Sequence, residues 1–221
     1  MVTVDPKAAA SAHQFTVVID GVETAVHEGV LRCGGGGTVA VVGPGVLEVT
    51  RLRHVVVRGG GGGDVRFARC EYAAAEDCAA ASFRRCGAVR VDGARGVAVR
   101  RCRSADVERA GAVAIRRCAG AARVRGAGEL RVGRCREADV AGCARAAVAR
   151  CRAARADWCG ALALGRVGSA DVARCGAVAV RRGKVSVVEA LKPVSPPPVD
   201  QQALLGGAGG NHEQVNRGSS T

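Results

Sequence analysis

The sequence predicts an all-β protein, a parallel β-solenoid (β-helix) with 16-residue coils, an N-terminal β-hairpin cap and a disordered C-terminal tail. Three observations predict this fold. From Cys70 onward, the cysteines recur at sequence intervals of 8 or 16, apart from one interval of 17. Within each eight-residue unit, apolar residues alternate with a period of two, as in a strand. Only 2% of the residues are aromatic although 48% are hydrophobic, which suits a thin, repetitive core.

The first element, within residues 1–37, is a β-hairpin over residues 14–31 with its turn at Asp20-Gly21. Its two strands are followed by His27 and by the apolar pair Val30-Leu31. This pattern resembles the start of a BTB/POZ domain, where such a hairpin leads into the first helices. The resemblance implies self-association or partner recruitment. A plain hairpin that caps the solenoid is the alternative.

Residues 38–63 alternate like strands but drift off the eight-residue frame, which predicts irregular first coils. Gly43, Pro44 and Gly45 are typical of a turn, and the glycine run at residues 59–63 is typical of a loop. Neither this run nor the one at residues 34–37 carries the residues of a phosphate-binding loop.

Residues 64–191 form the regular solenoid. The eight-residue units alternate between two kinds, so each coil has one strand on each of two faces, which we call face A and face B. Positions three and five of each unit point inward, and they are bulkier on face A than on face B. Position eight is usually Cys or Ala, which fits a tight turn. One extra residue near Ala119 accounts for the interval of 17.

The outward residues at position four of face B alternate in charge from coil to coil. Alternation removes the repulsion that like charges would suffer in a parallel stack, and it favours ion pairing between coils. The column is therefore interpreted as a structural charge ladder. Its members are Arg90, Asp106, Arg123, Asp139, Arg155 and Asp171.

An arginine occupies position seven of face A in every coil. The entire net charge of +13 lies between residues 64 and 183, and this arginine column carries much of it. A polyanion could bind along the column, whereas solubility of the sheet protein is the simpler interpretation. Nucleic acid is possible but not favoured as the partner, because few aromatic residues are present for base stacking. The column comprises Arg69, Arg85, Arg101, Arg117, Arg134, Arg150, Arg166 and Arg182.

Small residues occupy position four of face A, where exposed strands normally carry larger polar side chains. A flat apolar surface of this kind often marks a contact surface, and it predicts a homo-oligomer (dimer or trimer) or a protein partner. The alternative is that these positions accept many residue types and that the codon usage of a GC-rich genome makes alanine common there. The interface candidates are Ser82, Ala98, Ala114, Ala147, Ala163 and Ala179.

The segment VVVRG at residues 55–59 and the segment VAVRRC at residues 97–102 are similar to right-handed parallel β-helix proteins of the pectin-lyase-like type. The resemblance spans residues 38–190. It implies the architecture, and it makes an inactive or divergent carbohydrate-active β-helix protein the third functional expectation.

The search for catalytic, cofactor and metal sites yields none. The four histidines do not pair with cysteines at zinc spacing, and Asp106, Asp139 and Asp171 are interpreted as ion-pair partners. The odd number of cysteines and the absence of a signal-peptide pattern favour reduced thiols, so we expect a cytoplasmic or otherwise intracellular protein that is not in a membrane.

The end of the chain carries a predicted closing strand or cap at residues 185–191 and a Pro-, Gly- and Ser-rich disordered tail at residues 192–221. Taken together, the sequence predicts a non-enzymatic structural or protein–protein interaction solenoid that self-associates. A polyanion- or nucleic-acid-binding module that uses the arginine column is the second functional hypothesis.

Overall fold

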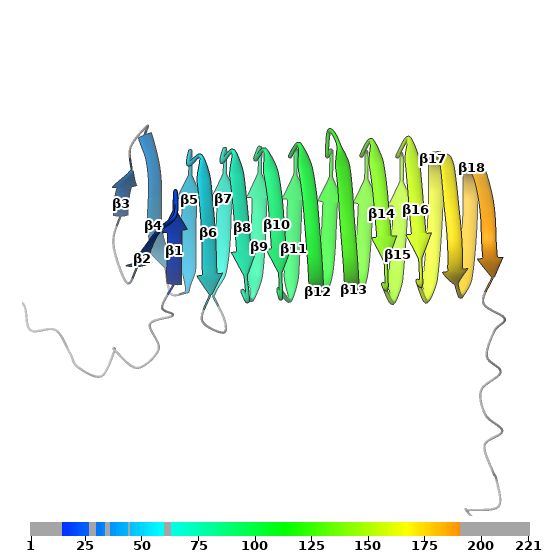
Figure 1. The fold of residues 1–221 in the computed structure, drawn as a ribbon, viewed down its shortest axis with the longest axis horizontal. Coiled ribbons are helices and arrows are strands. Elements are labelled where there is room, and N and C mark those ends of the chain that lie inside the picture. Colours follow the sequence, from blue (N-terminus) through cyan, green and yellow to red (C-terminus); the bar gives the residue numbers. More distant parts are fainter. Residues whose placement is uncertain (1–14, 27–29, 34–35, 44, 60–62, 191–221) are drawn as a thin grey trace, which may run out of the picture.

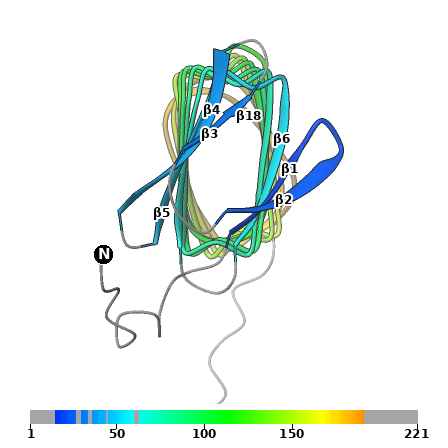
Figure 2. The same ribbon diagram turned by 90° about the vertical axis from the view of Figure 1, so that its left-hand side faces the viewer.

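The computed structural model describes residues 15–26, 30–33, 36–43, 45–59 and 63–190. These residues form one 18-stranded sheet wound into a solenoid, without an α-helix. Figure 1 shows the coils stacked side by side, and Figure 2 shows that each coil is a flattened oval with two long faces. The predicted fold class, an all-β parallel solenoid, is confirmed. The tail predicted at residues 192–221 lies outside the described residues.

An antiparallel unit stands at the N-terminal end. Strands β1 (Phe15–Ile19) and β2 (Val22–Val26) form the predicted hairpin, and β1 also pairs antiparallel with β6 (His54–Gly59). The turn residues Asp20 and Gly21 have φ values of 48° and 87°, the left-handed conformation that a two-residue hairpin turn requires.

The chain continues in strands where the BTB/POZ resemblance leads us to expect helices. Val30 and Leu31 lie in β3 (Val30–Cys33), which pairs antiparallel with β4 (Gly37–Gly43), and β4 pairs antiparallel with β5 (Val46–Thr50). The expected helical continuation is therefore wrong for the described part of this segment. His27 lies outside the described residues.

Both long faces are built from short parallel strands. Face A contains β5 and then β7 (Asp64–Ala68), β9 (Ala80–Arg84), β11 (Gly96–Arg100) and β15 (Arg145–Ala149). Face B contains β6 and then β8 (Tyr72–Glu76), β10 (Ala88–Asp92), β14 (Glu137–Ala141) and β16 (Ala153–Asp157). Four longer strands run through a turn and contribute to both faces: β12 (Ser104–Arg116), β13 (Ala121–Gly133), β17 (Ala161–Cys175) and β18 (Ala177–Ala190).

The register between coils follows the cysteine spacing. Val97 lies beside Val113, one regular coil further along the chain, whereas Ala105 lies beside Ala122, one coil and one extra residue further along. The extra residue falls in the turn between β12 and β13, at the predicted place near Ala119. The coil of β5 and β6 already stacks in register on β7 and β8, but it has 18 residues instead of 16, since Val46 lies beside Asp64 and His54 beside Tyr72.

The core is a thin layer between the two faces. The side chains at positions three, five and eight are buried there, and no polar or charged side chain of the described residues is buried with them. The register places the same position of neighbouring coils side by side. Phe67 and Phe83 therefore lie face to face, with their ring centroids 4.7 Å apart. The last coil departs from the prediction. Val178 and Val180 belong to the inward columns but are 37% and 44% exposed, because no further coil of the described residues covers them.

Candidate functional site

The predicted arginine column lies at the turn that leads from face A to face B, which we call the first turn. The arginines from Arg69 to Arg166 have φ values between 57° and 61°, in the left-handed region. Each backbone N–H continues the ladder between coils, as when Arg101 donates to the carbonyl of Arg116 at 3.1 Å. This geometry places one guanidinium per coil on the outer edge of the solenoid. Arg182 ends the column differently, because a register shift after Leu164 places it beside Gly165 instead of Arg166, and its φ is not positive.

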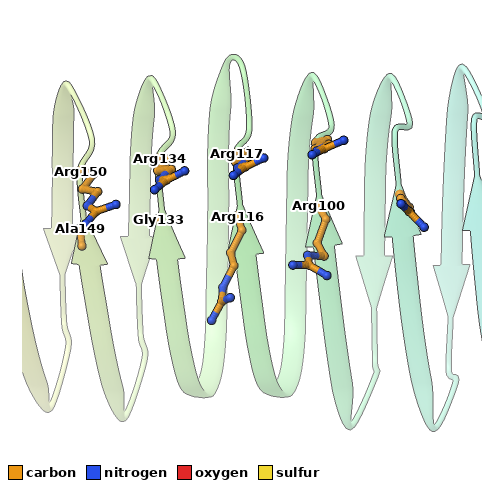
Figure 3. Close-up of a pocket in the computed structure, with 9 residues that line it drawn as sticks. Arg100, Arg116, Arg117, Gly133, Arg134, Ala149 and Arg150 are labelled. Carbon is orange, nitrogen blue, oxygen red and sulfur yellow. The ribbon is translucent and has the colours of Figure 1, made fainter.

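A second set of arginines joins this column. Position six of face A carries Arg84, Arg100 and Arg116 in three successive coils, and each side chain is exposed. Figure 3 shows Arg100 and Arg116 extending along their strands, whereas Arg117, Arg134 and Arg150 project from the turn. The two sets line a hollow of about 510 Å³, which we call the arginine groove; its lining residues are Arg84, Arg100, Arg101, Arg116, Arg117, Gly133, Arg134, Ala149 and Arg150.

The groove continues toward the C-terminal end of the stack. Arg150 also lines a second hollow of about 500 Å³ together with Arg166, Arg181 and Arg182. Two members of the predicted column, Arg69 and Arg85, line neither hollow.

The groove arginines have no acidic partners in the described part of the chain. Every ion pair found there within 4.0 Å involves other arginines. Most of these pairs join neighbouring coils, for example Arg58 with Glu76 and Arg66 with Glu48. The solenoid can therefore form ion pairs between coils, but the arginines at positions six and seven of face A that line the groove form none within the described residues.

The sequence predicted only part of this groove. The column at position seven was visible from its spacing, but Arg84, Arg100 and Arg116 were not among the predicted site residues. Their signal was the Arg-Arg doublet at positions six and seven of face A in three successive coils, at Arg84-Arg85, Arg100-Arg101 and Arg116-Arg117.

The interface candidates form a stripe on the outside of face A, in two groups of three residues. The register places Ser82, Ala98 and Ala114 beside one another, and then Ala147, Ala163 and Ala179. Arg131 separates the two groups, since it lies beside Ala114 on one side and Ala147 on the other. In the neighbouring column, Glu129 forms an ion pair with Arg145. Shallow hollows of about 510 and 440 Å³ lie over the two groups.

Face B presents a charged surface instead. The six residues of the predicted charge ladder lie beside one another in register, from Arg90 and Asp106 to Arg155 and Asp171. Contrary to expectation, none of these neighbours forms an ion pair within 4.0 Å. Close pairs form nearer the second turn, where Arg109 binds Asp92 and Arg174 binds Asp157 through two hydrogen bonds each.

All eleven cysteines are free thiols, and ten of them are buried. The first turn stacks six in successive coils, at positions 70, 86, 102, 118, 135 and 151. Burial raises the pKa of Cys78 to about 11. For Cys70 and Cys102, the hydrogen bond with the Cys86 thiol and then burial raise the pKa. The raised pKa values keep the thiols of Cys70, Cys78 and Cys102 neutral at pH 7.

No group of three or more His, Cys, Asp and Glu side chains in the described ranges is arranged to hold a metal ion. Within those ranges, the chain also forms no helix that is long and apolar enough to cross a membrane. His13 and His212 lie outside the described residues.

Comparisons with protein-family models, with curated proteins and with solved structures give no match. The resemblances to BTB/POZ and pectin-lyase-like proteins therefore gain no support from a family match, and the repeat architecture of a β-solenoid is what the structure supports.

Proposed function

We propose that this protein is a non-enzymatic structural scaffold that self-associates through the outer surface of face A. The observation that carries the proposal is the alanine stripe on a flat, in-register parallel sheet. Between β7 and β18 this surface measures about 34 Å by 16 Å, or about 550 Å² per protomer. Two such surfaces would bury about 1,100 Å², which is sufficient for a specific interface.

A second copy of the chain suits this surface because the surface is self-complementary. A two-fold axis that passes between Glu129 and Arg131 would place each Arg131 opposite the Glu129 of the partner. Arg131 has no carboxylate within 4.0 Å in the described part of the chain. The small side chains on either side would then let the two sheets pack face to face, about 10 Å apart or closer.

The N-terminal hairpin is a second element of the proposal, in line with the resemblance of residues 14–31 to BTB/POZ domains. Among the described strands, β2 pairs only with β1, and Val22 on β2 is 67% exposed. An open strand edge of this kind can pair with another chain. Replacing Val22 with Lys should weaken any assembly larger than the dimer and leave the face A dimer unchanged.

The test is the solution mass by light scattering at low and high salt, for the wild type and for the A98E/A114E/A147E variant. We expect a nucleic-acid-free dimer that survives high salt, and a monomeric variant because three glutamates per copy would be desolvated in the interface. The matched control is A88E/A121E/A153E, which adds the same charge to an outward column of face B that already holds Glu137. A dimer that persists in the first variant, or a monomeric wild type, would refute the proposed interface.

A further inference from the structure

The backbone conformation of the turns does not explain why arginine occupies the groove positions. From Asp77 to Arg174, the second turn of each coil has the same left-handed conformation, yet Asp77, Gly93 and Trp158 occupy it in three of these coils. Position six of face A, which supplies the other groove arginines, also accepts small residues, since it holds Ala149 and Gly165 in later coils. Arginine is therefore not required for folding at these positions.

The charge density of the groove is high and regular. Seven arginines line the first hollow, and their coils advance by about 4.8 Å each along a straight axis. The groove thus presents about one positive charge per 3 Å over about 19 Å. Without carboxylates nearby, these guanidinium groups repel one another, and a bound polyanion would relieve that repulsion.

The other side chains near the groove select among polyanions. Besides arginine, its lining consists of Gly133 and Ala149. The described phenylalanines are buried, and Tyr72 and Trp158 lie on the face B side of the molecule. No aromatic side chain lines the groove, so a single-stranded nucleic acid would lack aromatic stacking and would depend on its phosphate contacts and on stacking against guanidinium groups.

We propose that the arginine groove binds a condensed phosphate chain, inorganic polyphosphate, extended parallel to the solenoid axis. Such a chain carries a charge on every monomer and has no sugar or base to accommodate. Guanidinium groups are suited to it because they donate two parallel hydrogen bonds to phosphate oxygens. Adjacent phosphates of such a chain are closer together than the coils, so each coil would contact one or two of them. Affinity should rise with chain length until the chain spans both hollows.

The experiment measures binding of polyphosphate by calorimetry at several salt concentrations, for the wild type and for the R101N/R117N/R134N variant. Asparagine tolerates the left-handed conformation, so the variant loses charge without straining the turns. We expect its affinity at low salt to fall about thirtyfold. We also expect the slope of log affinity against log salt to shrink by about 2, for three lost phosphate contacts.

The control is R90Q/R123Q/R155Q, which removes the same charge from face B and should lower the affinity less than threefold. R84A/R100A/R116A provides a second groove variant, because the later coils already carry Ala or Gly at this position. Equal losses in the control and in both groove variants would overturn the proposal, as would the absence of polyphosphate binding at low salt. Tighter binding of single-stranded DNA or heparin of matched charge would also overturn it. Because none of these variants alters the alanine stripe, the outcome is independent of the dimer test.

Discussion

The two turns of each coil share a backbone conformation and differ in their side chains. At the first turn, φ lies between 57° and 61° from Arg69 to Arg166, and every residue is arginine. At the second turn, φ lies between 49° and 71°, and the residues are Asp, Gly, Arg and Trp. The left-handed turn therefore tolerates several residue types, and the unbroken arginine column must have a cause other than the backbone.

The arginines at the two turns also differ in their partners. At the second turn, Arg109 and Arg174 each bind the carboxylate of the preceding coil, and Arg174 also lies 5.0 Å from the centroid of the Trp158 ring. At the first turn, no arginine of the groove has such a partner within the described ranges. Arginines at the second turn thus stabilise the contact between coils, whereas the groove arginines at the first turn are available to bind a ligand.

The largest effect should come from breaking the backbone of either turn. Proline cannot adopt a positive φ and has no N–H, and both Arg101 and Gly142 donate an N–H to the next coil, at 3.1 and 3.0 Å. We expect R101P and G142P each to lower the free energy of unfolding by about 3 kcal/mol or more, as measured by chemical denaturation. If only one of them were destabilising, the two turns would not be equivalent in backbone.

Alkaline pH should have an intermediate effect, through the buried thiols behind the turns. The folded-state pKa of Cys78 is raised by burial to about 11, above its value in the unfolded chain, so the neutral thiol stabilises the fold at low pH. That contribution is lost as pH rises from about 9 to about 11. Allowing for solvent screening, the loss is about 1–2 kcal/mol.

The Cys78 prediction is checked by urea denaturation at pH 8 and pH 11. The matched variant is C78A, which the second turn should accept because Ala94 and Ala110 occupy the next coils of the same column. A variant with the same pH dependence as the wild type would exclude Cys78 as the source.

The sequence alone predicted the features of the fold that follow from its periodicity. The alternation of apolar residues defined the strands and the inward columns, and the interval of 17 located the extra residue near Ala119. It did not predict that Arg84, Arg100 and Arg116 join the arginine column in one groove, because that proximity depends on the left-handed turn and periodicity does not reveal φ. The exposure of Val180 was also missed, because it depends on what lies beyond the last coil and not on the residue itself.

The smallest and most discriminating effect should come from single asparagine substitutions, one at each turn. R150N keeps a left-handed residue and removes only an unpaired charge, so we expect its stability to be unchanged or to rise by a few tenths of a kcal/mol. R174N loses both the contacts with Asp157, at 2.5 and 2.9 Å, and the contact with the Trp158 ring, and should lose about 1 kcal/mol. Thermal and urea denaturation of the two variants measure the difference. If R150N were as destabilising as R174N, the first-turn arginines would be structural, and the distinction between the two turns would fail.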